Sequence, residues 1–90
     1  MMTLEFPNQS RSFEGTKNRV RFWGYDSAIE ITFFMEEEAL MKICPEANST
    51  EIALLDAFDY TVERIHQIAR KIYERSRDHS YVYVLAANDF

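Results

Sequence analysis

The chain has very little cysteine, with Cys44 the only one among 90 residues. A single thiol forms no intramolecular disulfide and no thiolate cluster for a metal, which is typical of a reducing compartment. No run of about 18 apolar residues occurs, and no basic stretch followed by an apolar run marks a signal peptide. We therefore expect a cytoplasmic protein that does not bind membranes.

Glycine, proline and positive charge are also scarce. Two glycines and two prolines leave no Gly-rich loop that could cradle a phosphate. Ten Lys and Arg against fifteen Asp and Glu give a formal net charge of −5, which disfavours partners held by phosphate contacts, and nucleic acid above all. A content of 47% hydrophobic and 14% aromatic residues is enough to fold without disulfides. We expect one domain over residues 1–90.

The apolar pattern before Met35 has the period of a β-hairpin. Val20, Phe22 and Gly24 alternate with Arg19, Arg21 and Trp23, and the second run has the same alternation on Ile29, Ile31, Phe33 and Met35. A turn at Gly24-Tyr25-Asp26-Ser27 predicts the pairs Phe22 with Ile29, Val20 with Ile31 and, on the outside, Arg21 with Glu30. Leu4–Phe6 and Ser12–Glu14 are candidates for short strands upstream.

The pattern after Met35 is helical. A short helix is predicted over Glu36–Cys44, with three glutamates in its first turn and Pro45 after it. A long helix is predicted from Thr50 to Arg75, on an apolar spine three and four residues apart. Ser80–Ala86 reads as a final strand, apolar on both faces, which predicts a place inside the sheet or a covered outer face. The spine consists of Leu55, Phe58, Val62, Ile65, Ala69 and Ile72.

These elements predict an α+β fold: an antiparallel, hairpin-built sheet of about four strands, with a short and a long helix on one face, in the order β-β-β-α-α-β. The segments LEFP, VRFWGYD, AIEITF, EALMKIC and AFDYTVERIHQIARKIY, with Phe13 and the closing Asn88-Asp89-Phe90, resemble the uncharacterised bacterial family catalogued as domain of unknown function 1488. The resemblance covers nearly the whole chain. It implies the same α+β fold, and it carries no established activity and no catalytic residues.

The long helix carries the one pattern with a possible chemistry. Glu63 and His66 form an E-x-x-H pair, which occurs in di-iron carboxylate bundles. With Asp59 and Arg70 they make a polar ribbon at near one-turn spacing. A di-iron site needs a second such helix, so a solvated helix face is the favoured interpretation and a metal site the alternative. Cys44 is interpreted as a small buried hydrophobe, because a nucleophile would need His66 or His79 as its base. The sequence identifies no catalytic, cofactor-binding or metal-ligating residue.

The outer face of the hairpin is the candidate interaction surface, with Arg19, Arg21, Trp23 and Phe34 as its main residues. Aromatic side chains beside arginines are used to stack bases in single-stranded nucleic-acid binders. Cover by the segment Leu4–Phe13, or by a second copy, is the alternative that we favour. The whole face comprises Arg19, Arg21, Trp23, Glu30, Thr32 and Phe34, extended either by Tyr81 and Tyr83 or by Val82 and Val84.

The function predicted is a non-catalytic interaction or regulatory module that forms a homodimer and has an unknown protein partner. A helix over Thr50–Arg75 would be roughly 39 Å long, against a diameter of about 30 Å for a compact chain of this size. The helix would overhang its sheet and need cover from a second copy. The alternatives are a small enzyme with a site around His66 and Glu63, or a weak single-stranded nucleic-acid binder using Arg19, Arg21 and Trp23.

Overall fold

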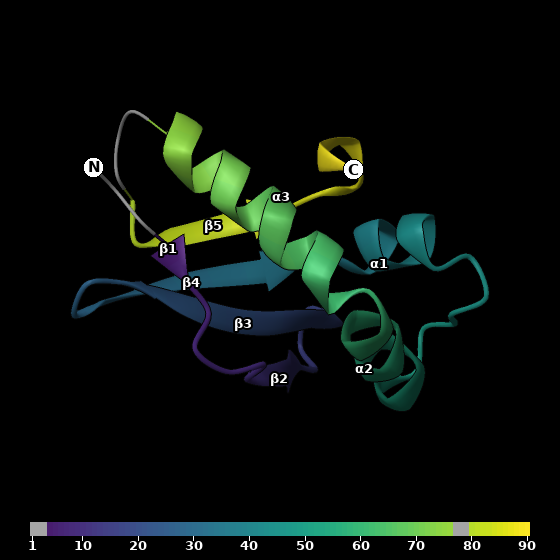
Figure 1. The fold of residues 1–90 in the computed structure, drawn as a ribbon. Helices are drawn as coiled ribbons and strands as arrows, with labels where there is room; N and C mark the ends of the chain where they lie inside the picture. The colour runs from purple at the N-terminus through teal and green to yellow at the C-terminus, as the bar shows by residue number, and fades with distance from the viewer. Residues whose placement is uncertain (1–3, 77–79) are drawn as a thin grey trace.

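The structure is a computed structural model that describes residues 4–76 and 80–90. Over these residues, one five-stranded sheet carries three α-helices on one of its faces (Figure 1). The predicted α+β class is confirmed, with one strand and one helix more than expected. The elements are β1 Leu4–Glu5, β2 Arg11–Glu14, β3 Arg19–Asp26, β4 Ile29–Met35, α1 Glu37–Ile43, α2 Glu51–Tyr60, α3 Val62–Arg75, β5 Val82–Leu85 and a closing 3₁₀ turn, Ala87–Asp89.

The central hairpin has the predicted faces but not the predicted register. Phe22 pairs with Phe33 and Val20 with Met35, so the expected pairing of Phe22 with Ile29 is wrong. The turn is Ser27-Ala28, with Ser27 at a φ of 57°. The shift is by an even number of residues, which keeps every side chain on its expected face. Ile29, expected inside, lies at the exposed end of the hairpin.

Gly24 was predicted to form the turn, but it lies within β3 and allows another strand to approach closely. β1 pairs with the Tyr25–Asp26 end of β3, and a Cβ on Gly24 would lie 2.8 Å from the carbonyl oxygen of Glu5. β2 pairs with the other end of β3, along Arg19–Phe22. Both predicted N-terminal strands are therefore confirmed, and they share one edge of the sheet.

β5 lies at the opposite edge and runs parallel to β4, so the sheet is mixed rather than antiparallel. The crossover through three helices is long enough to bring the chain back in the same direction. Of the two arrangements expected for this strand, a place inside the sheet or a covered outer face, the first is wrong. Val82 and Val84 are about half exposed on the side of the sheet away from the helices.

The predicted long helix is two helices that meet at Thr61. The Thr61 hydroxyl donates to the carbonyl of Ala57 at 2.7 Å, and its amide is shared between Ala57 and Phe58. A threonine that bonds to the preceding turn bends a helix, and here the bend separates α2 from α3. Thr50 is the N-cap of α2, since Thr50 Oγ1 accepts from the Ala53 amide. No helix in the described part of the chain is both long and apolar enough to cross a membrane.

The hydrophobic core lies between the helices and the inner face of the sheet. The sheet contributes Val20, Phe22, Ile31, Phe33 and Met35, all nearly inaccessible to solvent. α3 crosses this face, and α1 and α2 lie beside its end (Figure 1). The helices contribute Ala39, Leu40, Leu54, Ala57, Phe58, Val62, Ile65, Ala69 and Tyr73.

Candidate interaction surface

The outer face of the sheet forms as predicted and is continuous over β3, β4 and β5. Antiparallel partners share a face, so Arg21 lies beside Phe34 and Trp23 beside Thr32. Parallel pairing extends the face to Val82 and Val84, and this is the alternative that the structure selects. Tyr83 lies on the inner face, where its ring stacks on Phe33 at 5.5 Å.

The two arginines of the outer face lie over its aromatic rings. Arg19 Cζ is 3.7 Å from the centroid of Phe34, and Arg21 Cζ is 4.6 Å from that of Trp23. Each guanidinium also has an acidic partner, Glu14 at 2.8 Å and Glu30 at 3.4 Å. The expected ion pair between Arg21 and Glu30 is therefore present, although the two residues are not directly opposite. The arginines are held in place and their charge is balanced.

Sequence reasoning missed Glu14 as a member of this surface. Glu14 and Arg19 are direct partners in the β2–β3 pair. The signal was available, because Glu14 and Arg19 flank the turn at Gly15-Thr16, and a hairpin there sets opposite charges against each other. Glu5 lies at the corner of the same face, opposite Tyr25.

The N-terminal segment does not cover the outer face, so that alternative is wrong. β1 and β2 extend the sheet sideways, and Phe6 between them turns to the inner side. Its ring stacks on His66 with a centroid distance of 3.8 Å and an angle of 4°. Stacking removes the flat, largely apolar faces of both rings from water.

The polar ribbon holds this N-terminal segment, which is more than the solvated helix face we expected. Asp59 receives two hydrogen bonds from Arg11, at 2.9 and 2.8 Å. Arg70 Nε donates to the carbonyl of Leu4 at 3.1 Å and its guanidinium lies over the ring of Phe6. Glu63 is exposed. The hydrogen bonds to Asp59 raise the pKa of Arg11.

His66 is only 9% exposed, although the helical wheel places it at the margin of the apolar stripe. Burial, and then the charge of Arg70, lower the pKa of its imidazole to about 4. The ring is therefore neutral at physiological pH and serves as packing for Phe6. Within residues 4–76 and 80–90, no cluster of three or more His, Cys, Asp or Glu could hold a metal ion.

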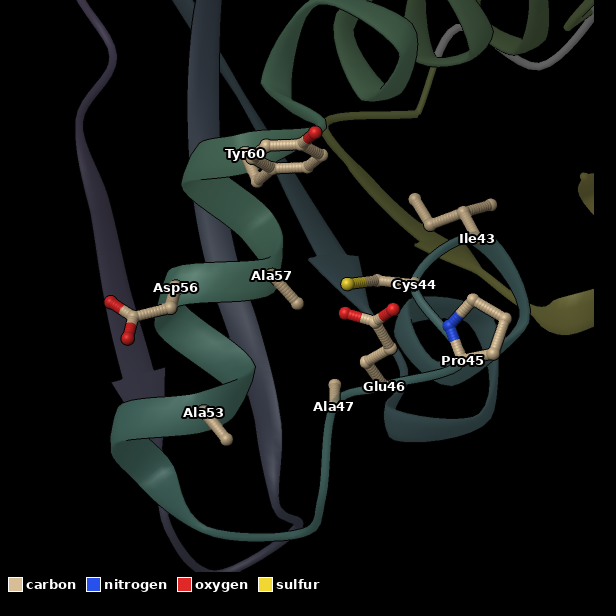
Figure 2. A pocket seen from close by; sticks show the side chains of 9 residues that line it. All are labelled: Ile43, Cys44, Pro45, Glu46, Ala47, Ala53, Asp56, Ala57 and Tyr60. Carbon is tan, nitrogen blue, oxygen red and sulfur yellow. The ribbon is translucent and has the colours of Figure 1, made fainter.

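Cys44 lines a cleft of about 560 Å³ between α2 and the loop that follows α1. Figure 2 shows its sulfur directed toward α2, near the carboxylate of Glu46. Cys44 is half-buried rather than buried. The described lining contains no histidine, because His66 packs on Phe6; His79 lies outside the described residues. The lining residues are Ile43, Cys44, Pro45, Glu46, Ala47, Ala53, Asp56, Ala57 and Tyr60.

One comparison with known proteins identifies this chain's family. The model of the family described as protein of unknown function (DUF1488) matches residues 4–85. The chain belongs to this family, as the resemblance of its strand and helix segments implied. Neither the curated proteins nor the solved structures gave a match.

Proposed function

We propose that this member of the DUF1488 family is a non-catalytic interaction module that self-associates as a homodimer. The observation that supports the proposal is the outer face of the sheet, on which Val82 and Val84 are about half exposed beside the partly buried rings of Phe34 and Trp23, each of which lies under an arginine. An exposed apolar patch bordered by polar residues often marks a site of protein interaction.

The bend at Thr61 changes the argument for a dimer. A continuous helix over Thr50–Arg75 would have projected beyond the sheet, but α2 and α3 are separate helices of 10 and 14 residues. The buried residues of both helices belong to the chain's own core. The expectation of a second copy therefore rests on the outer face of the sheet.

The charge distribution favours a protein partner over nucleic acid. Among the described residues, Arg19 and Arg21 are the cations that lie over the aromatic rings of the outer face, and each already has a glutamate within 3.4 Å. Nucleic-acid affinity arises when Lys and Arg replace the counterions of phosphates. Arginines that are already paired, on a chain of net charge −5, offer little of this free energy.

The position of the reactive side chains favours a module over an enzyme. A nucleophile needs a base within hydrogen-bond reach, and His66 is stacked on Phe6 rather than placed in the cleft of Cys44. With its pKa lowered to about 4, the imidazole is also a poor general base near neutral pH.

Sedimentation equilibrium of the wild-type chain tests the proposal. The monomer mass is 10.7 kDa, and we expect the weight-average mass to approach twice this value as the concentration rises through about 10 to 100 µM, the range of a weak and reversible interface. A mass of one chain up to the millimolar range would refute self-association. The measurement is made at two salt concentrations, because an apolar contact is much less sensitive to salt than a charged one.

A further inference from the structure

The free edge of β5 offers one route to a dimer, by pairing two copies into a continuous sheet. The carbonyls of Tyr81 and Leu85 accept from the amides of Thr32 and Glu36 in and beside β4. Backbone groups alternate in direction along a strand. Val82 and Val84 therefore direct their amides and carbonyls away from the sheet.

This edge is closed by the chain's own side chains. The hydroxyl of Ser80 donates to the carbonyl of Val82 at 3.0 Å and accepts from the amide of Val82 at 3.2 Å. At the far end of the strand, a carboxylate oxygen of Asp89 accepts from the amide of Ala86 at 2.8 Å. Only Val84 retains outward backbone groups, so edge pairing of two copies would gain about two hydrogen bonds.

The opposite edge is unsuited to pairing for another reason. β1 and β2 both lie along β3, and five residues, Phe6–Ser10, interrupt them. Pro7 within this stretch has no amide hydrogen to donate. Short, interrupted and proline-containing edges are how sheets avoid joining edge to edge.

The outer face is suited to a second copy in both area and charge. Four strand widths of about 4.8 Å and roughly six residues of about 3.4 Å give about 400 Å² per copy. Two copies would bury about 800 Å², less than the roughly 1,200 Å² of a standard interface and within the range of weak, transient contacts. At its centre, two arginines and two glutamates sum to zero charge, and Glu5 lies at the corner. The rest of the surface therefore carries most of the net charge of −5, so charge repulsion between two of these faces is weak.

From these observations we infer that the second copy docks on the outer face, sheet against sheet, and that β5 does not pair across the dimer. The inference rests on the proposed self-association. In such a sandwich the sheets lie about 10 Å apart with the helices outside. A two-fold axis between the sheets and parallel to them would set against each face a second face that carries the same two arginines and two glutamates.

Matched substitutions distinguish the face from the edge. Thr32→Lys places a charge at the centre of the face, on β4, which is an interior strand. Gln67→Lys makes the same addition of charge at an exposed position of α3. Ser80→Ala removes the hydroxyl that occupies the outward amide and carbonyl of Val82 at the edge of β5, and leaves the residues of the outer face unchanged. We expect Thr32→Lys to raise the dimer Kd at least tenfold, and the other two substitutions to change it less than threefold. Circular dichroism and thermal melting establish that each variant is folded.

Trp23 gives a readout that needs no substitution, because it is the chain's one tryptophan and lies on the outer face. A face dimer buries its ring, so dilution of the wild-type protein should shift the emission to longer wavelengths with the same midpoint as the mass. An emission unchanged across that midpoint, or a dimer kept in Thr32→Lys and tightened in Ser80→Ala, would overturn the face inference while self-association stands. A wild-type chain that is monomeric throughout would overturn both.

Discussion

Lowering the pH from 7 to 4 should destabilise the protein through His66. Its imidazole is 9% exposed and stacked on Phe6, with a centroid distance of 3.8 Å. Burial, followed by the charge of Arg70, lowers the pKa of His66 from 6.5 to about 4. Between these two values the unfolded chain binds a proton that the folded chain does not. The free energy of unfolding therefore falls as the pH falls from 6.5 to 4, and the contribution is fully present above pH 6.5.

The size of the effect follows from the shift. At 1.36 kcal/mol per pKa unit, a change from 6.5 to about 4 corresponds to at most about 3 kcal/mol, and water that reaches the ring edge reduces it. A loss of this size is a large part of the stability of a small domain. We expect β1 and Phe6 to detach before the rest of the sheet unfolds, because His66 and Arg70 hold this segment.

Urea unfolding at pH 7, 5 and 4 measures the effect, with His66→Phe as the control. Phenylalanine keeps a flat ring against Phe6 and does not titrate, while the carboxylates contribute equally in both proteins. The wild type should lose about 2 to 3 kcal/mol more than the variant between pH 7 and 4. Equal losses in the two proteins, or an NMR titration that gives His66 a pKa near 6.5, would refute the reasoning.

Three further predictions concern the packing and the partner. Gly24→Ala should lower the free energy of unfolding by about 1 to 3 kcal/mol, because the added Cβ would lie 2.8 Å from the carbonyl oxygen of Glu5; a variant as stable as the wild type would show that β1 shifts without cost. Tyr73→Phe removes the 2.6 Å hydrogen bond that the phenol donates to Asp26, and should cost about 1 to 2 kcal/mol by chemical denaturation; an unchanged midpoint would contradict this. Fluorescence titration with single-stranded oligonucleotides should show no sub-micromolar binding, and a tight, salt-sensitive affinity would refute the assignment of the outer face to a protein partner.

The faces of the hairpin could be predicted from sequence, but its register could not. Alternation alone assigned Phe22 and Phe33 to the core and Arg21 and Phe34 to the outside. The register depended on the turn, and Gly24 offered the usual signal for one. Gly24 is needed instead for contact with β1, while Ser27 adopts the positive φ. The approach of β1 to Gly24 joins two segments that are separated in sequence, and a local pattern does not contain such a contact.

The helix break and the position of β5 were missed for similar reasons. The apolar spine continues through Thr61, so periodicity shows no interruption; the break comes from the hydroxyl of Thr61 bonding to Ala57. β5 is apolar on both sides, as an interior strand would be, and its place at the edge leaves Val82 and Val84 exposed. Sequence pattern associates a strand that is apolar on both sides with the interior of a sheet, and β5 lies at an edge instead. Departures of this kind are expected at functional or strained sites.

For the polar ribbon, the spacing along the helix predicts which side chains lie near one another, but it does not predict their partners. Spacing placed Asp59, His66 and Arg70 near one another, but their partners Arg11, Phe6 and Leu4 come from a segment about 50 or more residues away in sequence. Side chains at near one-turn spacing were interpreted as solvated because helix pairs of this kind are common. In the structure, three of these four residues contact the segment from Leu4 to Arg11.

The most direct test of self-association through the outer face is a map of amide chemical shifts against protein concentration, recorded by ¹H–¹⁵N NMR. On dilution through the dimer midpoint, we expect the largest shifts at Arg21, Trp23, Thr32, Phe34 and Val84, with the amides of α3 and of the Cys44 cleft nearly unchanged. Shifts that concentrate on α2 and the Cys44 cleft, or no concentration dependence at all, would contradict the account.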